Sequence, residues 1–300
     1  IRNADAAMYH AKSAGGNTYG FYSPDMNADA VDRLMLKSEL HRALERHEFQ
    51  ILYQPKVDLR DGRIAGAEAL LRWRHPKRGD VPPGNFIPLA EESSVIFDIG
   101  EWVLNRVCKD YASWQARLAW PGRVAVNLSL RQLRQRDFVQ RIEATFEKHR
   151  LTPSCVELEI TESTLMDNID TTAGVIRALR ETGIRISVDD FGTGYSSLNY
   201  LQRFAVSSIK IDRSFVQQIT TDTDIATIVR GIIAMAHAAG LGVIAEGVET
   251  AAQLAFLRRL HCDQFQGYLF SKPLAADAAG HLLALEATRG SLLDSAERAS

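Results

Sequence analysis

Short apolar segments alternate with longer amphipathic segments over most of the chain. The short segments predict eight strands, with the sequences FQILYQPKVDL, RIAGAEALLRW, RVAVNLS, CVELEIT, IRISVDD, SSIKIDR, GVIAEGV and DQFQGYL. Apolar positions with helical spacing follow at residues 138–149, 171–182, 224–239 and 251–260. This alternation predicts parallel strands joined by crossover helices.

The first two predicted strands are separated only by a tight turn at Asp61-Gly62. A short turn joins antiparallel neighbours, so this pair should form a hairpin. Eight strands are enough to close a barrel. We therefore expect an α/β fold, a modified TIM (β/α)8 barrel with one antiparallel strand near its start. A doubly wound open sheet is the alternative, but no GxGxxG follows a predicted strand.

Two helical patterns precede the barrel. The segment ADAAMYHAKSAGGNTYGFY predicts a short amphipathic helix, stopped by Gly15-Gly16-Asn17 and followed by a short strand. A longer helix is predicted over residues 27–47, where Val31, Leu34, Met35, Leu40 and Leu44 form an apolar stripe.

Composition and charge exclude several classes of protein. With 46% hydrophobic and 24% charged residues, the chain is typical of a globular protein. A formal net charge of −2 argues against binding to a nucleic-acid polymer. The longest apolar region, residues 231–245, is too short to span a bilayer, so we expect no direct membrane contact. Because Ile1 has no leader before it, we expect an excised fragment without a signal peptide.

The three cysteines are widely separated and form no CxxC pair. They favour free thiols in a reducing compartment, and therefore a cytoplasmic location. They are Cys108, Cys155 and Cys262.

Polar side chains stand at nearly every predicted strand end, where a β/α barrel carries its reactive groups. Each has an ordinary structural explanation when taken alone, and Asp189-Asp190 before a glycine is also a turn signal. Taken together they indicate a cation site, because burying several carboxylates without cations costs several kcal/mol per ion. The residues are Gln54, Glu68, Asn127, Glu159, Asp189, Asp190, Lys210, Asp212, Glu246 and Gln266.

Carboxylates plus one amide oxygen, with no Cys or His at the strand ends, make a hard-oxygen site. Such a hard-oxygen set suits Mg²⁺ or Mn²⁺ rather than zinc. Two ions a few Å apart activate water and stabilise in-line displacement at phosphorus. Lys210 would hold the attacking water or neutralise phosphoryl charge, and the fork of Arg72 suits a phosphate oxygen.

Seven motifs, in order, resemble those of EAL-domain cyclic-di-GMP phosphodiesterases. They are EALLRW from Glu68, VNLS from Val126, ELEITES from Glu157, DDFGTGYSSL from Asp189, KIDR from Lys210, EGVE from Glu246 and QGY from Gln266. The resemblance covers roughly residues 36–283. It implies a cyclic-guanylate-specific phosphodiesterase, a hydrolase that opens cyclic di-GMP to linear pGpG with two Mg²⁺ or Mn²⁺ ions.

The resemblance also implies roles for individual residues. Ligands of one metal would be Glu68, Asn127, Glu159 and Asp189. Asp189 would bridge to a second metal held with Asp190 and Glu246, while Lys210 would contact the nucleophilic water. Glu246 has two possible roles, general base or ligand, and we favour ligation. Residues near the dinucleotide would be Gln54, Leu71 through its backbone, Arg72, Asp212 and Gln266.

A loop beginning at Phe191 resembles the family's loop that couples dimer contacts to metal binding. Its implied members are Phe191, Gly192, Thr193 and Gly194, with Glu162 as the anchoring glutamate. A passive connector is the alternative. The resemblance also implies a homodimer.

The N-terminal segment resembles the last helix and strand of a GGDEF domain, although Gly16 stands where a basic residue is commoner. We expect a GGDEF remnant at 1–24, the start of a linker helix at 25–35, the EAL domain at 36–285 and a tail at 286–300. The parent would be a bacterial tandem GGDEF-EAL protein with these domains in the cytoplasm.

Two other functions compete with hydrolysis. An inactive EAL receptor would bind cyclic di-GMP and signal by conformation, but such receptors usually lack ligands that this chain keeps. An enolase-type barrel would use Lys210 as a carbon-acid base with one Mg²⁺, but the additional Asp190 and the motif order argue against it.

Overall fold

The computed structural model describes residues 21, 24–118, 120, 122–166, 169–192 and 204–293. This part of the chain divides into two compact units. One contains the described residues of 1–50 and 72–96, and the other contains those of 51–71 and 97–300. The helix and strand predicted within the first 20 residues, together with Thr193 and Gly194, lie outside the described residues.

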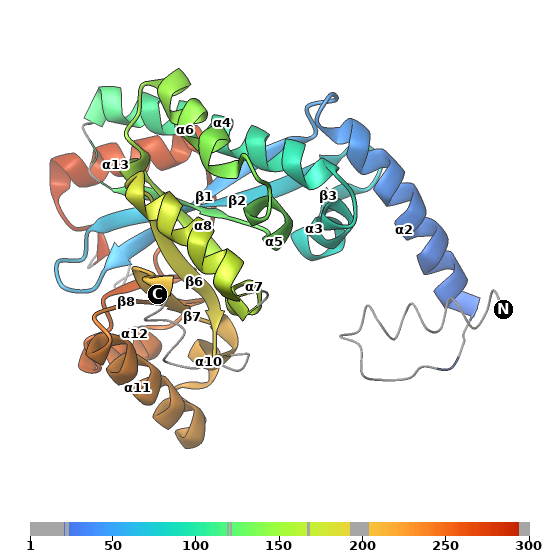
Figure 1. Ribbon diagram of the computed structural model, residues 1–300. Coiled ribbons are helices and arrows are strands. Elements are labelled where there is room, and N and C mark those ends of the chain that lie inside the picture. The colour runs from blue at the N-terminus through green and yellow to red at the C-terminus, as the bar shows by residue number, and fades with distance from the viewer. Residues whose placement is uncertain are drawn as a thin grey trace. The chain divides into compact units, whose positions relative to one another are not determined.

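Eight strands close into a barrel, because β1 pairs with both β9 and β2 (Figure 1). Around the barrel the order is β1 (Phe49–Asp58), β9 (Gln264–Gln266), β8 (Gly242–Glu246), β7 (Ser208–Ile211), β6 (Arg185–Phe191), β5 (Val156–Thr161), β4 (Arg123–Asn127) and β2 (Ile64–His75). A short strand, β10 (Leu274–Ala275), adds to β1 outside this ring. The predicted barrel is confirmed, and the alternative prediction of a doubly wound open sheet is wrong.

Strand β1 runs against its neighbour β9, whereas β2 and β4 to β9 pair in parallel. The turn between β1 and β2 is closed by the Asp58 amide, which donates to the Arg63 carbonyl at 2.8 Å. Gly62 has a φ of +69°, which glycine adopts without the steric penalty of a Cβ. The predicted hairpin with one antiparallel strand is therefore present.

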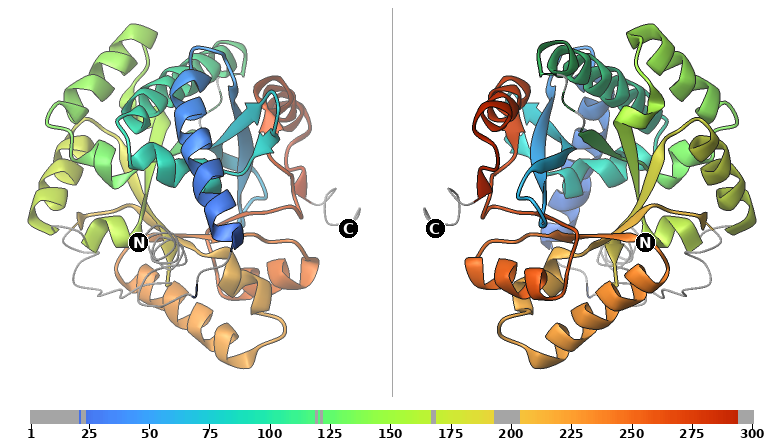
Figure 2. Two further views of the ribbon diagram at one scale, coloured as in Figure 1. Left: turned by 90° about the vertical axis from the view of Figure 1, so that its right-hand side faces the viewer. Right: turned by 90° about the vertical axis from the view of Figure 1, so that its left-hand side faces the viewer.

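Helices lie outside the strands of the barrel unit (Figures 1 and 2). The long ones are α4 (Val95–Leu118), α6 (Phe138–His149), α8 (Ile169–Glu181), α11 (Thr223–Ala238), α12 (Ala251–Arg259) and α13 (Ala276–Arg289). Shorter ones are α5 (Leu130–Leu133), the 3-10 turn η1 (Pro153–Cys155), α7 (Glu162–Met166) and α10 (Arg213–Gln218). The four helices predicted between strands agree with α6, α8, α11 and α12 to within two residues.

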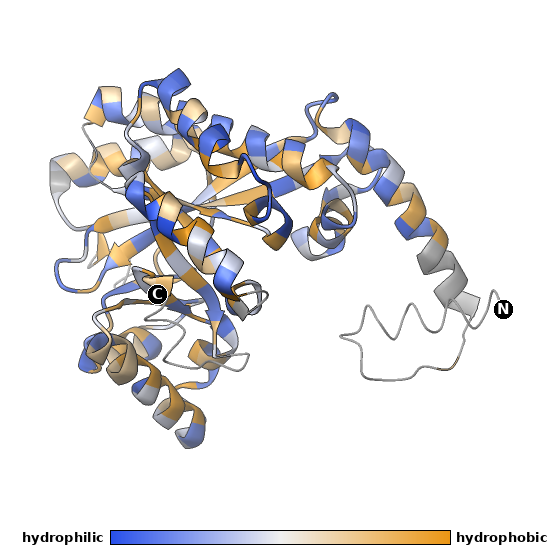
Figure 3. Cartoon of the chain, viewed as in Figure 1, coloured by the Kyte–Doolittle hydropathy of each residue, from blue (hydrophilic) through white to orange (hydrophobic). Residues whose placement is uncertain are grey.

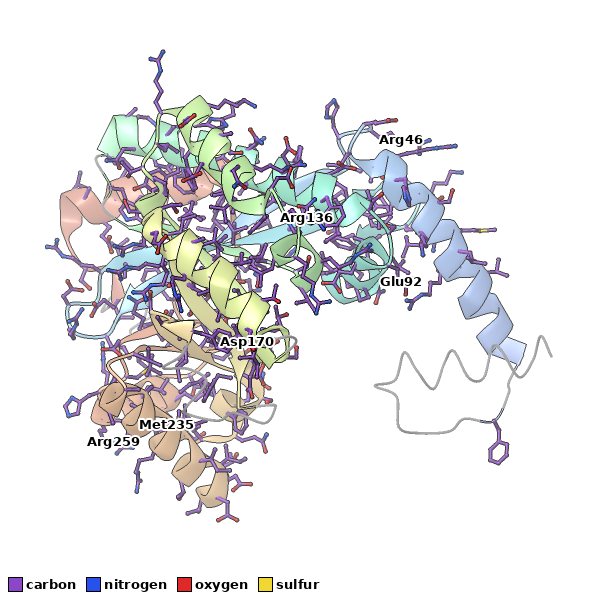
Figure 4. All side chains as sticks on the ribbon, in the orientation of Figure 1. Arg46, Glu92, Arg136, Asp170, Met235 and Arg259 are labelled. Atoms are coloured by element: carbon purple, nitrogen blue, oxygen red, sulfur yellow. The ribbon has the colours of Figure 1, made fainter. Side chains whose placement is uncertain are left out.

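The core of the barrel unit lies between strands and helices. Val124, Ile186, Ile209 and Val243, from strands β4, β6, β7 and β8, are all fully buried. Helices such as α8 and α11 carry both apolar and polar segments, as an outer layer requires (Figure 3). Charged side chains such as Arg259 on α12 point outward (Figure 4).

The other unit contains α2 (Pro24–Ala43), β3 (Gly79–Val81) and α3 (Pro83–Glu91). Trp73 and Phe86 pack edge to face, and the Trp73 indole donates to Glu48 at 2.8 Å. Helix α2 ends at Ala43, before the predicted end at residue 47. The Glu48 amide returns to the Ala43 carbonyl, and His47 takes a left-handed φ of 55° that a helix cannot continue.

Among the described residues, no helix combines the length and the apolar character that a bilayer crossing needs.

Candidate active site

The carboxyl ends of the parallel strands bring one lysine into the centre of four carboxylates. Lys210, on β7, is fully buried. Its Nζ lies close to one oxygen of each carboxylate, and the four oxygens belong to β2, β5, β6 and β8. The distances are 3.5 Å to Glu68 Oε2, 2.7 Å to Glu159 Oε2, 3.1 Å to Asp189 Oδ1 and 2.6 Å to Glu246 Oε1.

Amide side chains fix the orientation of Glu68. Asn127 Nδ2, at the end of β4, donates to Glu68 Oε1 at 2.7 Å. Gln266 Nε2, on β9, donates to Glu68 Oε2 at 2.7 Å and also reaches Gln54 Oε1 at 2.9 Å. Gln54 in turn donates to the Ser271 carbonyl at 3.1 Å. Both carboxylate oxygens of Glu68 are therefore held, while Asn127 itself remains exposed.

Asp189 and Asp190 are neighbours in sequence, and in a regular strand their side chains would point to opposite faces. Strand β6 is irregular here: three steps from Val188 to Phe191 oppose two steps from Ile209 to Ile211 on β7. Asp190 takes a positive φ of 53° at this bulge. Bulges re-aim side chains in this way, and carboxylate oxygens of Asp189, Asp190 and Glu246 come to lie within 4.8 Å of one another.

The electrostatics of the site show an excess of negative charge. Burial raises the pKa of Glu159 to about 8, of Glu246 to about 7 and of Asp190 to about 6, and neighbouring carboxylates add to each rise. Burial would lower the pKa of Lys210, but the carboxylates around it hold that pKa well above its ordinary value. One ammonium group does not balance this cluster, and an all-oxygen donor set fits a hard divalent cation.

Glu162, at the start of α7, connects to the end of β6. Its Oε2 accepts a hydrogen bond from the Gly192 amide at 3.2 Å. Its Oε1 is buried and has no hydrogen-bond partner among the described residues. Gly192 has a φ of +100°, and Phe191 before it is 2% exposed. Glu162 therefore contacts the end of β6 at Gly192, and its role as the anchor of the loop stays a prediction. The loop beyond Gly192 lies outside the described residues.

The remaining predicted residues occupy different surroundings. Asp212 caps α10, since its Oδ1 accepts from the Ser214 amide at 2.9 Å, and it also raises the pKa of Asp190. Leu71 and Arg72 are half-buried on β2, and Arg72 belongs to the first compact unit.

Sequence reasoning missed Lys56, which contacts Glu159 of the cluster, and its partner Glu157. Lys56, on β1, places its Nζ 2.8 Å from Glu157 Oε2 and 3.3 Å from Glu159 Oε1. Two features of the sequence could have pointed to them. One is a lysine within an apolar strand, and the other is a pair of glutamates two residues apart, whose side chains share one face of their strand.

Fold and site together define an α/β-barrel domain with an acidic cluster at the carboxyl ends of its strands. The chain belongs to the EAL domain family, whose model matches residues 37–273. The family resemblance is thus confirmed, whereas the GGDEF remnant stays a prediction.

Several relatives carry names that describe their activity. The chain is 46% identical over 275 residues to the bifunctional diguanylate cyclase/cyclic di-GMP phosphodiesterase MucR of Pseudomonas aeruginosa, covering 92% of this chain and 40% of that protein. It is 42% identical over 283 residues to the cyclic di-GMP phosphodiesterase NbdA of the same organism, covering 94% of this chain and 36% of NbdA. The chain thus spans less than half the length of these relatives.

A solved structure of the PaMucR phosphodiesterase in complex with c-di-GMP is also similar. It superposes with a TM-score of 0.79 at 43% identity, covering 82% of this chain and 99% of that one.

Proposed function

We propose that this chain is a metal-dependent phosphodiesterase that hydrolyses cyclic di-GMP to linear pGpG. The observation that carries the proposal is the cluster of oxygen ligands around Lys210, in which Glu68, Glu159, Asp189 and Glu246 all lie within 3.5 Å of its Nζ. The names of MucR and NbdA, and the c-di-GMP complex of PaMucR, support this substrate.

Two divalent ions, Mg²⁺ or Mn²⁺, fit the donor set. Ligands of the first would be Glu68, Asn127, Glu159 and Asp189. Asp189 would be shared with the second, which Asp190 and Glu246 would complete, in agreement with the grouping of these three carboxylates. When bound, such ions lower the pKa of water and stabilise charge on the phosphoryl oxygens.

The chain's own residues would orient the reactants. Lys210 would hold the attacking water by a hydrogen bond and offset the charge that develops on the phosphoryl group. The water oxygen forms a bond to phosphorus and gives up a proton, while one ribose oxygen leaves and takes up a proton as a hydroxyl. One phosphodiester of the ring therefore opens. We assign Glu246 to ligation rather than to proton abstraction, because it lies with Asp189 and Asp190.

Substrate contacts are proposed for the residues around this centre. Gln54 and Gln266 form a hydrogen-bonded pair beside Glu68 and would face the dinucleotide. Asp212, the backbone of Leu71 and the guanidinium of Arg72 would complete the contacts. We also propose that the chain forms a homodimer, which sedimentation across the micromolar range would test.

Chromatography of reaction products tests the function. With Mg²⁺ or Mn²⁺ the chain should convert cyclic di-GMP to pGpG, and excess EDTA should abolish turnover. Ca²⁺, whose coordination is larger and looser, should support binding better than turnover. Equal turnover in EDTA would refute the metal mechanism. Binding of cyclic di-GMP without turnover under every metal condition would instead identify a receptor.

A further inference from the structure

Lys56 is a second lysine buried inside the barrel, and the proposed mechanism gives it no role. It lies on the antiparallel strand β1 and is 2% exposed. Its Nζ lies 2.8 Å from Glu157 Oε2 and 3.3 Å from Glu159 Oε1, both on β5. The two glutamates are two residues apart, so their side chains share one face and one ammonium reaches both.

Glu159 is consequently held from two sides. Lys56 contacts its Oε1, and Lys210 contacts its Oε2 at 2.7 Å. The Glu159 side chain is fully buried. Each carboxylate oxygen offers two lone-pair positions, so these contacts leave positions open for a metal ion. Two cations on two different oxygens fix the plane of the carboxylate.

Glu157 balances the charge of Lys56 without touching the cluster around Lys210. Its Oε1 accepts from the Ser208 hydroxyl at 3.1 Å, and that hydroxyl lies 3.0 Å from the Ser187 hydroxyl. Burial raises the pKa of Glu157, but Lys56 and Ser208 outweigh burial and hold it below its ordinary value. Glu157 is therefore a stable counter-charge for Lys56.

The backbone leaves room for the lysine at Gly66 on β2. A Cβ on Gly66 would lie 3.4 Å from Lys56 Cε and 2.8 Å from the Arg123 carbonyl oxygen. A larger residue at this point would press on both groups. The lysine stem therefore passes beside a position without a side chain on its way to β5.

We propose that Lys56 is a positioning residue that fixes the Glu159 carboxylate for divalent-cation binding. This inference rests on the proposed function, because Glu159 is a proposed metal ligand. Residues that orient metal ligands typically change metal affinity about 10- to 100-fold when they are lost. Removal of Lys56 should therefore weaken metal binding even where the net charge of the site is kept.

Two variants separate orientation from charge. Lys56→Met/Glu157→Leu removes a buried ion pair without changing net charge, and apolar replacement of such pairs is tolerated by folds. Glu157→Gln keeps Lys56 and its contact with Glu159, yet makes the network more positive by one charge. Orientation predicts weak metal binding only in the double variant. If net charge alone decided metal binding, Glu157→Gln would bind metal weakly and the double variant would bind it like the parent chain.

The measurement is Mn²⁺ binding to the free protein, followed by the electron paramagnetic resonance of unbound Mn²⁺. Thermal melting by circular dichroism reports folding, and cyclic di-GMP turnover at saturating Mn²⁺ is recorded alongside. We expect the Mn²⁺ Kd of the double variant to rise about 10-fold or more. The Kd of Glu157→Gln should stay close to that of the parent chain.

Three results would overturn the inference: a double variant with the parent Kd, equal weakening of both variants, or a double variant that does not fold. The last would assign Lys56 to folding. A parent chain that neither binds Mn²⁺ nor turns over cyclic di-GMP would refute the proposed function itself. A parent chain that does both, with an unaffected double variant, would refute only the role of Lys56.

Discussion

Two lysines are buried inside the same barrel, and they differ in how well their charge is matched. Lys56 contacts two carboxylates, Glu157 and Glu159. Lys210 contacts four, including Glu159. Desolvation penalises a buried charge in both places, so the number of partners sets the difference between the two surroundings.

The pKa values of the carboxylates beside the two lysines show the same contrast. Burial raises the pKa of both Glu157 and Glu246, but only at Glu157 does a lysine reverse the effect. The pKa of Glu246 stays raised, at about 7. Charge is therefore nearly balanced beside Lys56 and in excess around Lys210, where the strands end. An excess of negative charge costs stability, and proteins accept such a cost at functional sites.

The largest effect should follow from Glu68→Gln, which alters the cluster around Lys210, where negative charge is in excess. Turnover of cyclic di-GMP should fall about 100-fold or more, because a proposed metal ligand is lost and metal ions supply several kcal/mol of transition-state stabilisation. The melting temperature should fall, because Asn127 and Gln266 donate to the two Glu68 oxygens and one of these donors would face the new amide nitrogen. Burial would raise the pKa of Glu68, but Lys210 and these two amides hold that pKa below its ordinary value, so its ionised form stabilises the fold. Steady-state kinetics and calorimetry check this. A folded variant with near-parent turnover would contradict the ligand assignment.

Lys56→Met alone should act mainly on stability. It leaves Glu157 buried without its cation, and breaking a buried pair costs about 3–5 kcal/mol of the free energy of unfolding. Urea denaturation measures the change. Lys56→Met/Glu157→Leu is the matched control and should recover most of the loss. A Lys56→Met variant as stable as the parent chain would show that Glu157 does not need Lys56 as its counter-charge.

Metal ions should stabilise the folded chain by binding at the carboxylate cluster around Lys210. Mg²⁺ at about 100 times its Kd should raise the free energy of unfolding by about 2.7 kcal/mol. Melting curves with Mg²⁺ and with EDTA give this difference. The stabilisation should be largely absent in Glu68→Gln and retained in Glu157→Gln. Equal stabilisation in all three proteins would place the bound ion elsewhere.

A smaller effect is expected from Glu162→Ala, which removes the acceptor of the Gly192 amide. One hydrogen bond contributes about 1 kcal/mol, so the Mg²⁺ concentration for half-maximal activity should rise about fivefold. Glu162→Gln keeps an acceptor oxygen and serves as the control. If Glu162→Ala shows the parent Mg²⁺ dependence, the loop that begins at Phe191 is only a connector.

Much of the fold followed from local pattern. Hydrophobic periodicity placed the strands and the helices between them, and the tight turn at Asp61-Gly62 predicted the antiparallel start of the barrel. Helix α2 was less well predicted, because its end depends on the left-handed conformation of His47 and not on periodicity. Grouping of polar residues at strand ends was also predictable, because parallel strands end on one side of a barrel.

Tertiary structure decided which of these polar residues meet. The sequence determined that Asp189 and Asp190 end a strand, but only the bulge against β7 brings both toward Glu246. It placed Lys56 in an apolar strand, yet its partners are about 100 residues away, on a strand that only barrel closure brings near. Side-chain type and spacing are local properties of a chain. Charge balance depends on how strands far apart in sequence face one another, and no local pattern contains that information.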